Sequence, residues 1–322
     1  MKALNPEAVI IGGAVVDIPL APVDKAVFDA ASWPLESISM RVGGDALNES
    51  IALRRLGHGP LLVSKLGADA AGDFILRTLD EAGVDTAGVV REAGLDTAIN
   101  IVLVREDGER SFITNRNGSL RRLGPEDVLP AMDLPAFTGA KVACLASLFV
   151  SPMLTPENTS PLFERIRAMG IALCADSTRR KNGETVADPP VAAMLSHLDY
   201  FFPNLSEAAL LTGREDPDAI ADALLDCGVR HAVLKLGGRG CLLKSRTERH
   251  LVPAFPHARC VDTTGAGDTF AAGFIAGLLE GRSFRDCGRL ANAAASLCLE
   301  HVGANAAMWT RADVDERMTA IP

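Results

Sequence analysis

Short apolar runs alternate with amphipathic segments along this chain. Runs that are apolar at nearly every position are typical of strands buried on both faces, because the side chains of a strand point alternately to its two sides. The runs that we predict as strands are Val9 to Val16, Leu61 to Leu66, Val142 to Ala146, Ile171 to Ala175, Tyr200 to Phe202 and Ala232 to Leu236.

The segments between these runs carry a helical pattern. Within residues 73 to 82, Phe74, Ile75 and Leu79 share one face of a helix, and Gly83 is suited to a left-handed C-terminal cap. Repetition of strand and helix predicts a mostly parallel sheet covered by helices on both faces. The predicted fold class is therefore α/β, a three-layer α/β/α sandwich.

Two regions break this alternation. Residues 18 to 42 hold three prolines among scattered apolar positions, and residues 97 to 114 alternate around Glu106-Asp-Gly-Glu as a hairpin does. We interpret the two as a small antiparallel sheet that forms a lid. No repeat or low-complexity linker marks a boundary, so residues 1 to 322 are predicted to form one domain that includes the lid.

Composition and charge exclude several classes of protein. Hydrophobic residues make up 48% and charged residues 23%, as in soluble globular proteins with a sizeable core. The formal net charge of −9 gives no general attraction to nucleic acid. We find neither a signal peptide nor an apolar run of membrane-spanning length. Seven scattered cysteines and six histidines without ligand spacing predict no disulfide or structural metal, which favours the cytoplasm.

The strongest chemical signal is a glycine-rich loop that enters a helix. Residues 262 to 270 read Asp-Thr-Thr-Gly-Ala-Gly-Asp-Thr-Phe. Exposed amides at a helix start bind anions, so Gly265, Ala266 and Gly267 are predicted to form an anion hole. Asp268 at its rim is predicted to accept the proton of an attacking hydroxyl. By composition alone, an Asp and Thr pair that caps an ordinary helix explains the segment too.

This nine-residue pattern resembles the C-terminal signature of the ribokinase family, also called the phosphofructokinase-B (PfkB) family of carbohydrate kinases. Residues 43 to 48, Gly-Gly-Asp-Ala-Leu-Asn, resemble the N-terminal signature, so the resemblance covers nearly the whole chain. It implies a ribokinase-like sandwich with a β-sheet lid, and a sugar kinase that transfers the γ-phosphoryl of ATP to a hydroxyl. It also implies Asp268 as the base, Mg²⁺ as a cofactor, and a homodimer paired through the lid.

The resemblance assigns several acceptor contacts. In the family, Gly43 and Gly44 correspond to glycines that let the substrate approach the backbone, and Asn48 to a residue that contacts a hydroxyl. Asp17 matches an aspartate that binds sugar hydroxyls, although a turn or cap aspartate gives the same pattern. The chain departs from the family at positions 45 and 49, where acidic residues replace small or neutral ones.

Residues 115 to 119, Asn-Arg-Asn-Gly-Ser, follow the predicted hairpin. They resemble a segment of the family's 2-keto-3-deoxygluconate kinases in which the arginine binds the substrate, and a guanidinium can hold a carboxylate or adjacent hydroxyls. Arg116 and Asn117 are therefore predicted acceptor contacts; a solvated loop arginine is the alternative.

Three weaker patterns concern the nucleotide. Asn204-Leu-Ser-Glu207 has the spacing of a capping box and resembles the family element that organises Mg²⁺ through water. Residues 235 to 240, Lys-Leu-Gly-Gly-Arg-Gly, are by themselves typical of a hairpin. In the family, the matching segment is a strand end that lies against ATP. Lys235 stands where the family usually has a hydroxyl residue, and a surface lysine is an equal interpretation. Asn292 matches a position near the adenine and equally fits helix packing. The predicted ATP contacts are Asn204, Glu207, Lys235, Gly237, Gly238, Gly240 and Asn292.

The resemblance also implies a monovalent cation site. Asp262, the carbonyl of Thr264 and Gly303 match a K⁺ loop of the family, in which Ala307 stands where a serine is often found.

Other functions have less support in the sequence, and two alternatives stay open. Neither the phosphate-binding loop of the common NTPases nor the protein-kinase motifs occur, and Gly12-Gly13 does not complete a dinucleotide fingerprint. The alternatives are a nucleoside kinase of the same family and a non-catalytic sugar or nucleotide sensor. One tyrosine and two tryptophans give limited support for stacking a nucleobase.

Overall fold

The computed structural model of the protein describes residues 4–107, 109–178, 183, 185–256, 258–305 and 309–319. Its main body is built on a nine-stranded sheet with the order β13-β12-β11-β10-β9-β8-β1-β4-β5. The strands from β5 to β11 in this order are parallel, and β12 and β13 complete the sheet as an antiparallel edge. The strands are β1 (Ala8–Ile11), β4 (Pro60–Gly67), β5 (Asp85–Glu92), β8 (Val142–Leu148), β9 (Ala172–Ser177), β10 (Tyr200–Phe201), β11 (His231–Lys235), β12 (Cys241–Lys244) and β13 (Arg249–Val252).

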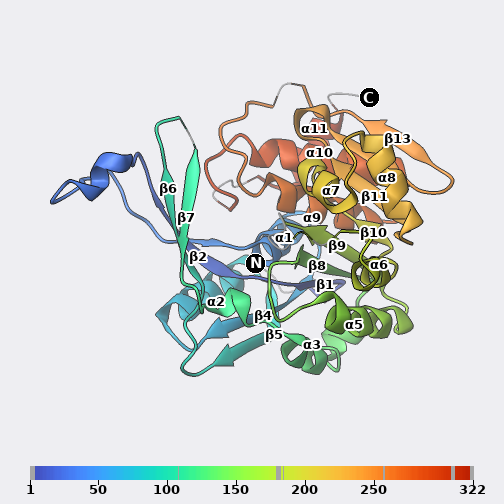
Figure 1. Ribbon diagram of the computed structural model, residues 1–322, viewed down its shortest axis with the longest axis horizontal. Helices are drawn as coiled ribbons and strands as arrows, with labels where there is room; N and C mark the ends of the chain where they lie inside the picture. Colours follow the sequence, from blue (N-terminus) through green and yellow to red (C-terminus); the bar gives the residue numbers. More distant parts are fainter. Residues whose placement is uncertain are drawn as a thin grey trace.

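Helices cover both faces of this sheet, which confirms the three-layer α/β/α prediction (Figure 1). One face carries α1 (Asp45–Arg55), α2 (Ala70–Ala82), α9 (Ala266–Leu279), α10 (Phe284–Cys298) and α11 (Arg311–Thr319). The other carries α3 (Pro125–Ala131), α4 (Pro135–Thr138), α5 (Pro156–Ala168), α6 (Pro189–Leu195), α7 (Leu205–Thr212) and α8 (Pro217–Asp226).

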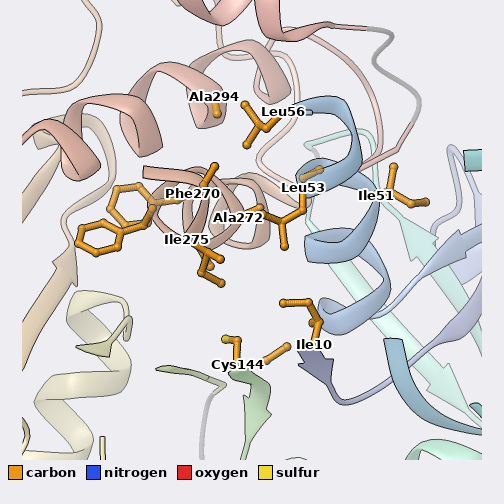
Figure 2. Packing of buried hydrophobic residues seen from close by; sticks show 14 of the residues in the cluster. Ile10, Ile51, Leu53, Leu56, Cys144, Phe270, Ala272, Ile275 and Ala294 are labelled. Atoms are coloured by element: carbon orange, nitrogen blue, oxygen red, sulfur yellow. The ribbon is translucent and has the colours of Figure 1, made fainter. Parts of the chain in front are cut away.

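The apolar strands supply both cores because their side chains alternate. In β1, Ala8 and Ile10 join the core under α1 and α9, whereas Val9 and Ile11 join the core on the opposite face. Figure 2 shows Ile10 and the neighbouring strand residue Cys144 beneath the apolar faces of α1 and α9. Both faces of the strand are thereby removed from water, which is the main driving force for this packing.

Helices α9 and α10 pack closely because glycine lies at their contact. A Cβ atom at Gly273 would lie 2.8 Å from Cα of Ala291, and one at Gly277 would lie 2.9 Å from Cα of Cys287. The backbones therefore approach to a distance that no larger side chain permits. This contact fixes the direction of α9, whose first turn carries Asp268.

A second sheet, of four strands, stands beside the main body in the order β3-β2-β6-β7 (Figure 1). Its strands are β2 (Val15–Leu20), β3 (Arg41–Gly43), β6 (Ile99–Val104) and β7 (Arg110–Thr114). The hairpin predicted within residues 97 to 114 is confirmed as β6 and β7; its predicted turn residue Gly108 lies outside the described residues. The short helix η1 (Lys25–Phe28) lies between β2 and β3.

Two predictions about this sheet were wrong in part. The sheet is not purely antiparallel, because β2 and β6 pair in parallel. The apolar run Val9 to Val16 is not one strand: it is divided between β1 of the main sheet and β2 of the small one. The division falls at Gly12 and Gly13, and a Cβ atom at Gly13 would lie 2.2 Å from Cδ1 of Leu120. The chain leaves the main sheet where a distant segment packs against it.

Other expectations about elements are confirmed. Residues 73 to 82 lie within α2, and Gly83 caps this helix with a left-handed φ of 75°. The remaining predicted strands lie within a residue or two of their observed limits. Across the described ranges, no helix has both the length and the apolar character needed to cross a membrane.

Candidate active site

A cleft of about 330 Å³ opens at the carboxyl ends of the central parallel strands. Ligands of open α/β sheets bind at this edge, because strand ends and helix starts converge there. The cleft is lined by Asp45, Asp176, Ser177, Thr178, Asn204, Glu207, Lys235, Gly237, Gly267 and Asp268. Six of the sequence-predicted site residues are in this set: Asn204, Glu207, Lys235, Gly237, Gly267 and Asp268.

The start of α9 places Asp268 at the cleft. Gly265 is the N-cap, in a left-handed conformation with φ of 76°, and a Cβ atom there would lie 2.2 Å from Cβ of Ala304. Ala266 begins the helix, and its N–H donates to the carbonyl of Thr263 at 3.3 Å, while Gly267 of the same turn lines the cleft. Asp268 in that turn has its Oδ2 atom 2.6 Å from the Asn48 side-chain amide nitrogen, which donates a hydrogen bond.

The environment of Asp268 raises the pKa of its carboxyl group. Burial raises the pKa of its carboxyl group, and the nearby charge of Asp45 raises it further, against the opposing hydrogen bond from Asn48. Asn48 is itself held in place, because its Oδ1 atom accepts a hydrogen bond of 2.6 Å from the side chain of Asn305. The result is a carboxyl group of raised proton affinity in a fixed orientation.

Lys235 lies beside the predicted anion hole. Its Nζ atom is 2.5 Å and 2.7 Å from the two carboxyl oxygens of Asp176, and a Cβ atom at Gly267 would lie 3.4 Å from it. Burial raises the pKa of Asp176 to about 7, and the ammonium of Lys235 works against that rise. Burial works to lower the pKa of Lys235, but the charges of Asp176 and Glu207 raise it above its usual range.

Two acidic residues of the cleft were not predicted as site residues. Asp176 follows the predicted strand Ile171 to Ala175. A polar residue at the carboxyl end of a parallel strand is a sequence feature from which this site residue could have been predicted. Asp45 accepts a hydrogen bond of 2.5 Å from Ser147. Glu49, by contrast, is fully buried in α1, and burial raises its pKa well above the usual range.

The predicted capping box at the start of α7 is confirmed. The Asn204 side chain accepts from the Glu207 backbone N–H at 2.9 Å, and the Glu207 carboxylate accepts from the Asn204 N–H at 3.0 Å. The hydroxyl of Ser177 donates to the same Glu207 oxygen at 3.1 Å. Both residues of the box line the cleft, so the structural and the phosphate-facing interpretations are compatible.

The glycines after β11 and Asn292 differ in their surroundings. Gly237 lines the cleft, and Gly238 beside it has open space where a side chain would be. Gly240 has a φ of 90°, and a Cβ atom there would lie 2.0 Å from the carbonyl oxygen of Val252, so it serves the β11–β12 hairpin. Asn292 is buried, and its amide donates to the carbonyls of Val252 and Pro253 at 3.1 Å each.

The predicted acceptor residues gather where β2, β3 and α1 meet. The Asp17 carboxylate accepts a hydrogen bond of 2.8 Å from Asn100, a residue that sequence reasoning missed. A Cβ atom at Gly43 would lie 2.1 Å from Oδ2 of Asp17, and Gly44, the N-cap of α1, has a φ of 97°. The left-handed conformation of Gly44 favours glycine, and Gly43 leaves room for the Asp17 carboxylate.

Burial raises the pKa of Asp17, the hydrogen bond from Asn100 lowers it, and the charge of Asp45 raises it. The charge of Asp45 thus raises the pKa of both Asp17 and Asp268, and Asp45 lines the same cleft as Asp268.

Arg116 and Asn117 follow β7 but do not line the cleft that holds Asp268. Arg116 is exposed, and among the described residues it has no hydrogen bond or ion pair. Asn117 lines a separate cleft of about 440 Å³ together with Lys65 and Arg122. The same segment nevertheless approaches the acceptor residues, because Leu120 packs on Gly13.

The residues predicted to bind a monovalent cation lie together at the start of the loop before α9. Thr264 and Gly303 donate backbone N–H groups to the two carboxyl oxygens of Asp262, at 2.9 Å and 2.8 Å. Arg110 of β7 pairs with the same carboxylate. Ala307, the remaining position of this predicted loop, lies outside the described residues.

A mostly parallel sheet covered by helices on both faces, with a separate small sheet beside it, defines a ribokinase-like α/β protein. The model of the pfkB carbohydrate kinase family matches residues 5–311, and the chain belongs to this family.

Named relatives agree with this assignment. Ribokinase of Arabidopsis thaliana is 28% identical over 98% of this chain and 81% of its own length. 2-Dehydro-3-deoxygluconokinase of Bacillus subtilis is 28% identical over 84% of each chain, and probable fructokinase-4 of A. thaliana is 30% identical over 84% of this chain and 86% of its own. The solved structure of A. thaliana ribokinase with ribose and ATP matches 98% of this chain and 99% of its own with a TM-score of 0.81 and 27% identity.

Proposed function

We propose that this chain is an ATP-dependent kinase that transfers the γ-phosphoryl group of ATP to a hydroxyl of a sugar or sugar acid. The observation that carries the proposal is the position of Asp268, in the first turn of α9 and hydrogen-bonded to Asn48 at 2.6 Å. The Asp268 carboxyl group can thereby contact the acceptor hydroxyl close to the helix start, where the phosphate charge is bound. The ribose and ATP bound by A. thaliana ribokinase support this choice of substrates.

In the proposed reaction, Asp268 accepts the proton of the acceptor hydroxyl as its oxygen attacks the γ-phosphorus. The bond from that phosphorus to the bridging oxygen breaks, and ADP leaves with the electron pair. The amides of Gly265, Ala266 and Gly267 donate to the developing negative charge. The ammonium of Lys235, next to Gly267, adds a second positive group at the same place.

The residues of the cleft also fit a magnesium ion held through water. Glu207 and Asn204 offer oxygen atoms at the start of α7, beside the phosphate-facing end of the cleft, and Mg²⁺ prefers oxygen ligands. When bound, Mg²⁺ would offset the negative charge of the phosphate oxygens. The hydroxyl of Ser177 and the backbone N–H of Asn204 orient the Glu207 carboxylate.

The acceptor is proposed to lie among Asp17, Gly43, Gly44 and Asn48, whose polar atoms suit sugar hydroxyls. Arg116 is proposed to reach a carboxylate or adjacent hydroxyls of the acceptor from its exposed loop. The named relatives act on ribose, fructose or 2-dehydro-3-deoxygluconate according to their names, so the class of acceptor is decided by experiment.

A coupled ADP-release assay across pentoses, hexoses, ketoses, sugar acids and nucleosides tests this proposal. We expect turnover with a sugar or sugar acid, and none in excess EDTA. Asp268→Asn is expected to lower kcat by about 10² or more while ATP binding is retained. Turnover with nucleosides alone would favour the nucleoside kinase. ATP binding without turnover on any acceptor would favour a non-catalytic sensor.

A further inference from the structure

The carboxylate of Asp262, just before the predicted anion hole, is bound by an arginine of the small sheet. Its Oδ1 atom accepts hydrogen bonds from the N–H and hydroxyl of Thr264, at 2.9 Å and 2.8 Å, and from the guanidinium of Arg110. Its Oδ2 atom accepts from the N–H of Gly303 at 2.8 Å. The Asp262 side chain is 6% exposed and that of Arg110 30%, so the ion pair is largely withdrawn from water.

These contacts keep the carboxylate charged. Burial by itself raises the pKa of Asp262, but the hydrogen bonds from Arg110, Thr264 and Gly303 lower it to about 2. The Asp262 side chain is buried and pairs with a guanidinium, and a carboxylate withdrawn from water requires such a counter-charge. Arg110 supplies that counter-charge from 152 residues away in the sequence.

As far as residues 258–305 describe the site, its arrangement does not fit a monovalent cation. A carboxylate has about two lone-pair directions on each oxygen, and Oδ1 of Asp262 already accepts three N–H or O–H groups while Oδ2 accepts one. Gly303 presents its N–H, not its carbonyl, to Asp262, and the Thr264 carbonyl lies 3.5 Å from the thiol of Cys298. Hard cations bind through oxygen lone pairs aimed at the ion. The guanidinium thus takes the role that the resemblance assigned to K⁺.

A second contact joins the same two partners. The guanidinium of Arg41, on β3, donates to the carbonyl of Val302 at 3.4 Å, next to Gly303. Strands β3 and β7 are the two outer strands of the small sheet. Both of its edges therefore contact the loops that surround Asp262.

On the basis of the proposed function, we propose that Arg110 is a positioning residue. Its guanidinium is a cation carried by the lid, and it holds the lid against the loop before α9. Because this charge already balances Asp262, the enzyme does not depend on a free monovalent cation. Asp262 precedes Gly265 by three residues, so its ion pair orders the approach to the anion hole. If the lid lifts, Asp262 loses its counter-charge and the loop loses this restraint. The anion hole is then complete only when the lid is closed.

The first test measures kcat in KCl and in tetramethylammonium chloride at equal ionic strength. We expect wild-type kcat to agree within about twofold, because the tethered charge needs no supplement. Arg110→Ala should lower kcat in tetramethylammonium by about tenfold, the scale of a lost charged hydrogen bond, and KCl should restore part of it. The matched control is Arg105→Ala, an arginine of the same hairpin paired with Asp107 and Glu109, which should behave as wild type.

The second test needs no substrate. Hydrogen exchange of the amides at residues 264 to 267 should be about tenfold faster in Arg110→Ala than in Arg105→Ala, because the loop has lost its restraint. Strong activation of the wild type by K⁺, or equal exchange and equal cation response in the two variants, would overturn the proposal. A chain without turnover on any acceptor would instead contradict the proposed function, while the exchange comparison still decides the role of Arg110.

Discussion

At the scale of single residues, the cleft combines several carboxyl groups with one buried ammonium. Burial raises the pKa of Asp45, Asp176 and Asp268, and the charges of Asp45 and Asp176 raise the pKa of Asp268 further. Lys235 offsets part of this charge through Asp176 and is close to Gly267. Bound phosphate would add negative charge to the same place, which makes the lysine the residue most able to balance it.

We therefore predict that Lys235→Met lowers kcat by about 10² with the true acceptor, the scale of one lost electrostatic contact in a transition state. The measurement is steady-state kinetics with ATP varied. Lys244→Met is the matched control, since Lys244 on β12 pairs with Asp218 and Asp222 outside the cleft. Equal kcat for the two variants would exclude a role for Lys235 in the transfer.

A second prediction at this scale concerns acceptor recognition by Arg116. Arg116→Ala should raise KM for the acceptor by about tenfold and leave KM for ATP nearly constant, because only the acceptor is proposed to meet this guanidinium. Arg121→Ala, which removes an arginine of the neighbouring turn, serves as a control for the loss of surface charge. An acceptor KM that does not change would leave Arg116 as a solvated loop residue.

At the scale of elements, Glu280 joins three segments at the end of α9. Its carboxylate accepts hydrogen bonds from Arg282 at 2.6 Å, from Arg311 of α11 at 3.1 Å, and lies 3.2 Å from the His58 ring that follows α1. Burial raises the pKa of Glu280, but these partners lower it to about 2. The helix that carries Asp268 is thus held at its far end by charge as well as by packing.

Glu280→Gln should therefore lower the free energy of unfolding by about 1 kcal/mol at neutral pH, a value reduced by partial exposure to water. The folded-state pKa of about 2 is below the ordinary value of 4.5, so this stabilisation is present above pH 4.5 and disappears as the pH falls toward 2. Urea unfolding at several pH values measures it.

The difference between wild type and Glu280→Gln should shrink over that acidic range, while effects of other groups cancel in the comparison. Asp315→Asn removes the more exposed partner of Arg311 and should change the free energy of unfolding by less than about 0.5 kcal/mol. A difference that is independent of pH would show that Glu280 stabilises through shape and not through charge.

At the scale of the whole molecule, the lid carries exposed apolar side chains. Phe28 is 82% exposed, Ile38 65% and Phe112 59%. Strand β7 is also an open edge of the four-stranded sheet. Open edges and exposed apolar residues favour pairing with another chain, so the lid remains the predicted interface of a homodimer.

We expect sedimentation to give a dimer for the wild type and mostly monomer for Phe112→Glu, because a carboxylate would be buried without a partner at the interface. Leu251→Glu is the control: Leu251 is 57% exposed on β13, at the edge of the other sheet. A wild-type monomer at working concentration would remove the pairing and leave the lid itself unaffected.

Local patterns in the sequence determined much of this molecule. Strand alternation in β1, the face shared by Ile75 and Leu79, and the spacing from Asn204 to Glu207 each depend on neighbours within a few residues. Such periods follow from backbone geometry, so they survive without tertiary information. The loop before α9 belongs here as well, since its glycines and Asp268 lie in one short segment.

Only the tertiary structure decided which distant residues meet. The run Val9 to Val16 is apolar throughout, but the packing of Leu120 on Gly13 divides it between two sheets. Asp176 and Lys235 pair across 59 residues, and Arg110 reaches Asp262 across 152. No short-range pattern marks such pairs, because their formation depends on where the fold places two backbones. The ion pair between Arg110 and Asp262 is therefore a property of the folded chain, and the sequence motif by itself did not indicate it.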